Sequence, residues 1–297
     1  MASTNYRKHW LVNALGNKYE FTEKESNLVF LNNPDGFGFR REYSSMIVGN
    51  SELVTSQRFL LGEITCEILF YTESIGGKYE DYQKFIQFAK YRPLEFHYQT
   101  PNKLTGYHCD VLFTSADKSE VDTDNILHVP VTFHRLTEWL TDEDTEYVFD
   151  NSPVGEGKFH DLVYDYYYTG TSLQGSSIVN NGTDDIGFVM IIEGLVQNPE
   201  FYLRQNGEVY GLGRINGTYD YVMIDSVERT EQIYLEYQGS AIPNPEQYQD
   251  FTIGTGSAYL TWCKLKVGES IFSFTCGNIE NFNGTVTIRY KESMATV

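Results

Sequence analysis

The chain has 297 residues, of which 41% are hydrophobic and 15% aromatic, so it can fill the cores of two domains and is not a disordered protein. Its formal net charge of −19 is dispersed through both halves, which argues against nucleic-acid binding, because that role needs clustered Lys and Arg to neutralise phosphates. The first residues are polar and no apolar run approaches the ~18 residues that span a membrane, so we expect a soluble protein made in the cytoplasm.

Strand-like runs dominate the N-terminal part of the chain. They lie at residues 9–15, 27–31, 40–48 and 60–71, with turn-forming segments at 33–36 and 49–50 between them. In the last run the apolar side chains alternate with polar ones, at Ile64, Cys66, Ile68 and Phe70. This alternation predicts a strand with one face in a hydrophobic core.

A helical pattern follows at residues 79–91. Tyr82, Phe85, Ile86 and Ala89 recur at the spacing of one helix face, which predicts that this stripe packs on a sheet. Pro93 ends the pattern, because it forces the residue before it out of the helical region.

Extended segments come next, at residues 94–99, 106–115 and 126–140. The acidic loop at residues 116–125 separates the last two, which predicts a long β-hairpin with a polar tip. We expect this hairpin to project from its domain and to contact neighbouring molecules.

A change in composition marks a domain boundary. Residues 141–158 turn acidic and then rich in Gly, Ser and Pro, so we place the domains at 1–150 and 159–297. The second domain contains short strand-like runs and four Asn-Gly pairs, at residues 181–182, 206–207, 216–217 and 283–284. Asn-Gly favours the two-residue turn of a β-hairpin, so these pairs predict an antiparallel sandwich built from hairpins.

Two pairs of residues suggest catalysis or metal binding, but both patterns are weak. His108 and Cys109 are neighbours on an expected strand, so their side chains point to opposite faces and cannot act as base and nucleophile. His128 and His134 are separated by about 20 Å of extended chain, which is too far to hold one metal.

Acidic residues and cysteines give no stronger signal. Asp117, Asp122 and Asp124 lack the Gly and Glu positions of an EF-hand calcium loop and indicate a solvated hairpin tip. The cysteines lie in apolar runs and are expected to be buried free thiols, at Cys66, Cys109, Cys263 and Cys276. The sequence therefore predicts no catalytic residue, no metal site and no bound cofactor.

Several segments occur in an order that carries a family resemblance. In the first half they are KYEDYQKF at 78–85, RPLEF at 92–96 and HVPVTF at 128–133. In the second half they are IIEG at 191–194, NP at 198–199, YVMIDS at 221–226, VGESIFSF at 267–274 and VTIRY at 286–290. With these segments nearly the whole chain resembles the distal tail protein family of phages with long non-contractile tails.

The resemblance implies a mainly β protein. Its first domain would be a β-sandwich belt domain with one helix and a long β-hairpin, and its second a galectin-like antiparallel β-sandwich. The implied role is a non-enzymatic hub at the virion tail tip or baseplate, where a hexameric ring joins the tail tube to the adhesion apparatus and lets DNA pass. The implied partners are further copies of the chain, the tail tube protein, the tape-measure protein, the tail-associated fibre or lysin hub protein and receptor-binding proteins.

Two alternatives stay open. A carbohydrate-binding module for host adhesion is suggested by Tyr164, Tyr166, Tyr167 and Tyr168, although a core-facing strand has the same pattern. A glycoside hydrolase needs only a pair of carboxylates, and two carboxylates on separate strands leave no local signature.

Overall fold

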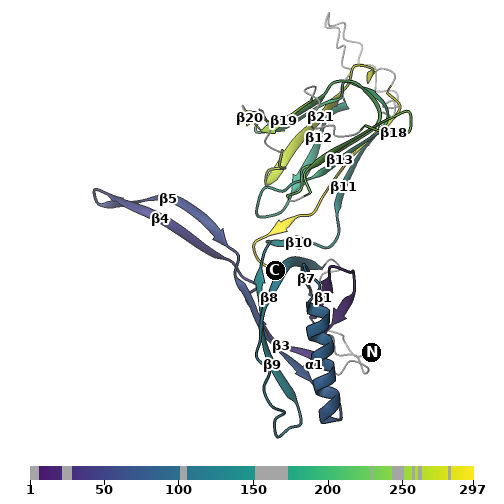
Figure 1. Cartoon of the computed structure of the whole chain (residues 1–297). Helices are drawn as coiled ribbons and strands as arrows, with labels where there is room; N and C mark the ends of the chain where they lie inside the picture. Colours follow the sequence, from purple (N-terminus) through teal and green to yellow (C-terminus); the bar gives the residue numbers. More distant parts are fainter. Residues whose placement is uncertain are drawn as a thin grey trace, which may run out of the picture. The chain divides into compact units, whose positions relative to one another are not determined.

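The structure is a computed structural model, and it describes residues 7–21, 29–100, 106–150, 173–228, 230–242, 251–255, 258–259, 263–279 and 282–297. The fold is mainly β, which confirms the expected class, and the described residues contain one α-helix (Figure 1). No helix in this part of the chain has the length and apolar character needed to cross a membrane.

The chain divides into two compact units. Unit 1 comprises Met1–Glu143 and Ser293–Val297, and unit 2 comprises Asp144–Glu292. The sequence placed a loose joint at residues 151–157, which lie outside the described residues.

Strand pairing explains where the units divide. Strand β11 (Thr145–Asp150) pairs along its whole length with β22 (Thr285–Tyr290), which draws residues before 150 into unit 2. Strand β23 (Ser293–Met294) pairs instead with β10 (Trp139–Thr141) and returns the chain to unit 1. Unit 2 is therefore inserted into the sequence of unit 1.

Unit 1 is built on one antiparallel sheet of nine strands. The main run has the order β2-β1-β7-β8-β9-β6-β3, while β10 pairs with β8 and with β23. The bounds of the remaining strands are β1 (Lys8–Asn13), β2 (Lys18–Glu20), β3 (Val29–Asp35), β6 (Glu63–Phe70), β7 (Leu94–Gln99), β8 (Tyr107–Ala116) and β9 (Leu127–Arg135).

One face of this sheet forms the core of unit 1. The expected alternation in β6 is confirmed, because its apolar side chains are buried, at Ile64, Cys66, Ile68 and Phe70. The same period places Leu94, Phe96 and Tyr98 of β7 in the core. Glu95 and His97 point to the opposite face of the sheet.

Helix α1 (Ile75–Ala89) covers the core (Figure 1). It begins before the expected position because Ser74 caps it, with the Gly77 backbone N donating to Ser74 Oγ at 3.0 Å. Phe85 and Ala89 of the predicted stripe are buried, and Tyr82 and Ile86 pack against the same cluster. The helix ends at Ala89, before Pro93.

The expected hairpin between residues 106 and 140 is confirmed as the pairing of β8 with β9, but it does not stand apart from the sheet. β6 pairs along β9, and β7 pairs with Tyr107–Val111 of β8, so the body of this hairpin lies within the sheet. The hairpin that stands apart is formed by β4 (Arg40–Val48) and β5 (Ser51–Leu60), which make a separate two-stranded sheet (Figure 1). We call it the β4–β5 hairpin.

Unit 2 is a sandwich of two antiparallel sheets, each with six strands. Their orders are β11-β22-β13-β16-β17-β18 and β12-β21-β14-β15-β19-β20. Residues of both sheets share one core cluster, in which Phe149 lies 5.1 Å from Phe272, ring centre to ring centre. The remaining bounds are β12 (Leu173–Asn180), β13 (Val189–Gln197), β14 (Glu200–Gln205), β15 (Glu208–Ile215), β16 (Thr218–Asp225), β17 (Gln232–Tyr237), β18 (Ser240–Ala241), β19 (Phe251–Thr255), β20 (Ala258–Tyr259) and β21 (Gly268–Thr275).

The Asn-Gly pairs do not all close hairpins. Asn206-Gly207 does so between β14 and β15, with both residues at positive φ. The pair at 216–217 instead joins β15 to β16, which belong to different sheets, and the pairs at 181–182 and 283–284 lie between strands of different sheets too. Among these three pairs only Gly217 has a positive φ, so they do not form the turn that Asn-Gly favours, and the expectation was right for one pair and wrong for three.

Candidate functional site

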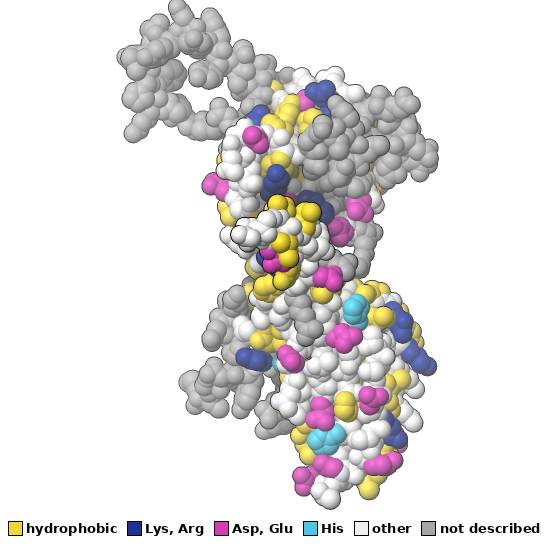
Figure 2. Space-filling view, turned by 90° about the vertical axis from the view of Figure 1, so that its left-hand side faces the viewer, with side chains coloured by type: hydrophobic (Ala, Val, Ile, Leu, Met, Phe, Trp, Pro, Cys, Tyr) yellow, Lys and Arg dark blue, Asp and Glu magenta, His cyan; other side chains and the backbone are white. Residues whose placement is uncertain are grey.

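The β4–β5 hairpin is the most exposed apolar element that the structure describes. Every side chain from Arg41 to Ser56 is exposed, and Ile47 reaches 81%. Met46 pairs with Leu53, so these two side chains share one face of the hairpin. Val54 and Ile47 lie on the other face. In Figure 2, which views the hairpin from its tip, hydrophobic side chains gather on it.

The base of the hairpin is fixed to the sheet by Arg135. Its Nη1 donates to the Gly38 carbonyl at 3.0 Å, and its backbone N donates to the Gly62 carbonyl at 3.1 Å. Gly38 precedes β4 and Gly62 follows β5, so one buried residue holds both ends of the hairpin, one through its side chain and the other through its backbone. A cavity of about 550 Å³ opens here, lined in part by Phe39, Leu60 and His134.

His108 and Cys109 do point to opposite faces of β8. Cys109 is fully buried in the core, where burial raises the pKa of its thiol, so it is not a reactive thiolate. His108 contacts Asp142 on the other face. All four cysteines are buried thiols that form no disulfide, as the sequence predicted.

The other residues that the sequence singled out have structural contacts. Asp122 closes the β8–β9 turn, because its Oδ1 accepts from the backbone N of Asp124 and of Ile126. His128 lies between the carboxylates of Asp122 and Glu67, each 3.0 Å from a different ring nitrogen. The expected polar hairpin tip is therefore a hydrogen-bonded turn.

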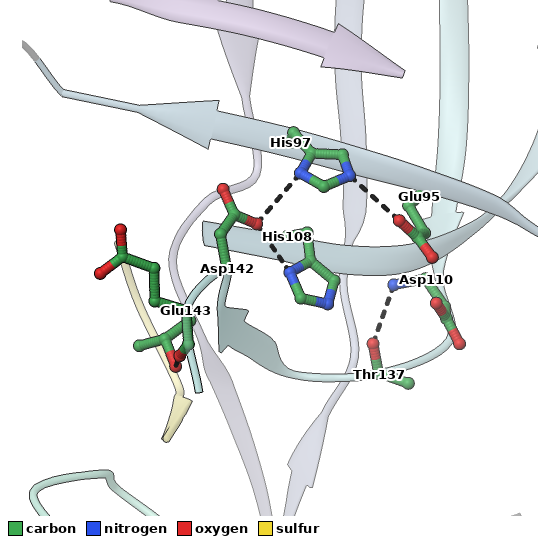
Figure 3. A network of polar contacts seen from close by, with 8 residues as sticks. Glu95, His97, His108, Asp110, Thr137, Asp142 and Glu143 are labelled. Carbon is green, nitrogen blue, oxygen red and sulfur yellow. Dashed lines mark hydrogen bonds and ion pairs between the residues drawn. The ribbon is translucent and has the colours of Figure 1, made fainter. Parts of the chain in front are cut away.

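A polar cluster on the outer face of the unit 1 sheet joins three elements (Figure 3). His97 of β7 and His108 of β8 are cross-strand partners. Their Nδ1 atoms lie 3.0 and 2.8 Å from the same oxygen, Oδ1 of Asp142, which follows β10. Glu95 lies 3.1 Å from Nε2 of His97. We call His97, His108 and Asp142 the two-histidine cluster.

Charge and burial shape this cluster. Burial lowers the pKa of His97, but its hydrogen bonds to Asp142 and Glu95 and their negative charges outweigh burial and raise the pKa overall. Burial raises the pKa of Asp142, whereas the hydrogen bonds from His108 and His97 lower it well below the usual range. The ligand atoms of these three side chains lie within 4.8 Å of one another. Among the described residues, this is the group of His, Cys, Asp and Glu side chains that is close enough to hold a metal ion.

Sequence reasoning missed His97 and Asp142. They are separated by 45 residues, so no local spacing connects them. A weak signal existed in the alternation of β7 and β8, which puts His97 and His108 on the face away from the core. The tyrosines suggested for sugar binding, Tyr164, Tyr166, Tyr167 and Tyr168, lie outside the described residues.

Comparison with known proteins gives a family match within the first unit. Residues 8–136 match the family model described as the N-terminal domain of the distal tail protein, which confirms the resemblance over this part of the chain. No curated protein sequence matches the chain.

Solved structures from two phages share this fold. A chain of the phage P2 baseplate, in its activated conformation with Ca, matches with a TM-score of 0.56 and 12% identity, over 98% of this chain and 100% of that one. The Dit protein of phage SPP1, described as a hub of the adsorption apparatus, matches with a TM-score of 0.62 and 9% identity, over 96% and 98% of the two chains. At these identities the likeness establishes a shared fold.

Proposed function

We propose that this chain is a structural hub protein of a phage tail tip, in which six copies form a ring that joins the tail tube to the adhesion apparatus and lets DNA pass. The family match of residues 8–136 and the fold shared with a baseplate chain and with a hub protein support this role. The role is mechanical, and no bond is made or broken in it.

The observation that carries the proposal is the β4–β5 hairpin. A two-stranded hairpin is marginally stable alone, and apolar side chains on both of its faces remain in water in the single chain. A ring of identical subunits needs two different surfaces that fit each other, and a projecting arm supplies one of them. We propose that the hairpin of one copy packs against unit 1 of the next.

The further partners follow from the same role. The ring would contact the tail tube protein and the tape-measure protein on one side. On the other it would contact the tail-associated fibre or lysin hub protein and receptor-binding proteins. Its place would be the virion, after synthesis in the host cytoplasm. The dispersed charge of −19 suits a ring through which DNA moves, because acidic walls do not hold phosphates.

Native mass spectrometry and negative-stain images of the full chain test the proposal. We expect a six-fold ring that forms with increasing protein concentration. Two double variants place charges on opposite faces of the hairpin: Met46→Glu with Leu53→Glu, and Ile47→Glu with Val54→Glu. At least one should abolish the ring while calorimetry shows an unchanged fold, because all four side chains are exposed.

The matched control changes exposed apolar residues elsewhere, Leu195→Glu with Val209→Glu in unit 2. It should assemble like the original chain. A chain that stays monomeric at every concentration would refute the ring, whereas a ring that survives both hairpin variants would refute only the role of the hairpin.

A further inference from the structure

We propose that the two-histidine cluster is a binding site for a divalent transition metal, with Zn²⁺ as the ion that fits it best. The sequence alone predicted no metal site in this chain. The proposal rests on the geometry of unit 1 and does not depend on the proposed function.

The distances suit a small ion. A tetrahedral Zn²⁺ site has bonds of about 2.0–2.2 Å to His nitrogen and carboxylate oxygen, which puts neighbouring ligand atoms about 3.3 Å apart. In the cluster, Oδ1 of Asp142 lies 3.0 Å from Nδ1 of His97 and 2.8 Å from Nδ1 of His108. All three ligand atoms lie within 4.8 Å of one another, so small movements of the side chains bring them to this spacing.

The donor types select the metal. Two imidazole nitrogens and one carboxylate oxygen favour Zn²⁺ and its first-row neighbours, whereas Ca²⁺ and Mg²⁺ prefer oxygen ligands alone. Three protein ligands leave a fourth tetrahedral position, which water can take, because the side chain of Asp142 is 23% exposed.

The surroundings of the cluster resemble the support of a metal site. When Nε2 of His97 donates its proton to Glu95, 3.1 Å away, its Nδ1 has a free lone pair for the metal. Trp10 stacks on the ring of His97 at 4.9 Å between ring centres and fixes its plane. The two histidine rings themselves stack at 5.2 Å.

Gly106 makes room for the carboxylate. A Cβ atom at this position would lie 2.2 Å from Oδ2 of Asp142, so only glycine lets the carboxylate sit where it faces both histidines. The Asp142 backbone N also donates to the Gly106 carbonyl at 3.0 Å. The position of the third ligand is therefore set by the backbone as well as by its side chain.

Calorimetric titration of the untagged full chain with ZnCl₂ tests the site, with excess Mg²⁺ present to saturate surface carboxylates. We expect one Zn²⁺ per chain with a micromolar or tighter dissociation constant. His97→Gln and His108→Gln should each weaken binding by at least about 100-fold, and Glu95→Gln by about 10-fold. Co²⁺ should give the visible absorption of a tetrahedral site in the original chain and not in His108→Gln.

His128→Gln is the matched control, because His128 also lies between two carboxylates in unit 1 but has them on opposite ring nitrogens. It should bind Zn²⁺ like the original chain. If His108→Gln fails to fold by circular dichroism, Asp142→Asn and Glu95→Gln replace it. The proposal is overturned if the original chain binds no Zn²⁺ at micromolar concentrations, or if the ligand variants bind it unchanged.

Discussion

Single residues in unit 1 show how burial and charge set local stability. His9 is 6% exposed, and its Nε2 has no hydrogen-bond partner among the described residues. Its ring stacks on Tyr98 at 5.3 Å and on Phe37 at 6.0 Å. Burial, with the nearby charge of Arg7, lowers the pKa of His9 from 6.5 to about 4. At a pH between about 4 and 6.5, this histidine is therefore neutral in the folded protein and protonated in an unfolded chain.

His9 predicts a loss of stability in mild acid. The neutral His9 ring contributes fully to the free energy of unfolding above pH 6.5. This contribution is lost as the pH falls toward 4, because the unfolded state binds a proton at His9 and the folded state does not. The full loss is about 3 kcal/mol, at about 1.4 kcal/mol for each unit of pKa. Urea unfolding of the original chain and of His9→Phe between pH 7 and 4 checks this. Equal slopes against pH in the two proteins would contradict it.

Two glycines at positive φ predict different costs of substitution. A Cβ on Gly207 meets open space, whereas a Cβ on Gly36 would lie 1.9 Å from the backbone oxygen of Glu63. Gly207→Ala should therefore cost only the backbone strain, about 1–2 kcal/mol. Gly36→Ala should cost clearly more, because the backbone next to the β4–β5 hairpin must move. Chemical denaturation of both variants measures the difference, and equal losses would show that the contact at Gly36 relaxes freely.

At the scale of elements, local pattern predicted some strands and hid others. The bounds of β4 match the strand-like run expected at residues 40–48. β5 was missed because its exposed side chains mix Ser, Glu, Leu and Val without one buried face. The sequence assigned the projecting hairpin to β8 and β9, because their acidic tip does not reveal that β7 and β6 pair with them in the sheet.

Helix α1 gives a test at this scale. Its first turn depends on Ser74, whose Oγ accepts from the backbone N of Gly77. Ser74→Ala should lower the free energy of unfolding of unit 1 by about 1 kcal/mol. Ser51→Ala, at an exposed position beside the turn of the β4–β5 hairpin, is the control and should change it little. Calorimetry of both variants decides whether the cap acts as described.

For the whole molecule, the sequence predicted two β-rich units but not their connection. The contacts of Asp142 with two histidines and of β23 with β10 join residues far apart in the chain, which no spacing rule anticipates. The family resemblance predicted the fold class, whereas the two-histidine cluster became visible only through the pairing of β7 with β8. Long-range pairing, not local propensity, decides both features.

The return of the chain to unit 1 gives a prediction for the molecule. Ser293 donates to Glu138, Ala295 is buried, and Met294 and Val297 pack on the core of unit 1. Ending the chain at Glu292 should therefore lower the stability of unit 1 by about 2 kcal/mol or more. Unit 2 should be unaffected. Calorimetry resolves this if the units unfold separately.

The control is Tyr290→Phe, which removes a hydrogen bond to the Val179 carbonyl within unit 2 and should shift only the other transition. A truncated chain whose unit 1 melts at the original temperature would show that β23 contributes nothing.

The insertion of unit 2 also fixes an order of events during translation. The ribosome makes β23 only after every residue of unit 2, so unit 1 stays without its final strand while unit 2 emerges. A nascent chain thus cannot finish the unit that bears the hairpin until the inserted unit has been made. The same double crossing means that a proteolytic cut at the first crossing leaves unit 2 attached to unit 1 through the pairing of β23 with β10, whereas a cut at the second crossing leaves the two units covalently joined.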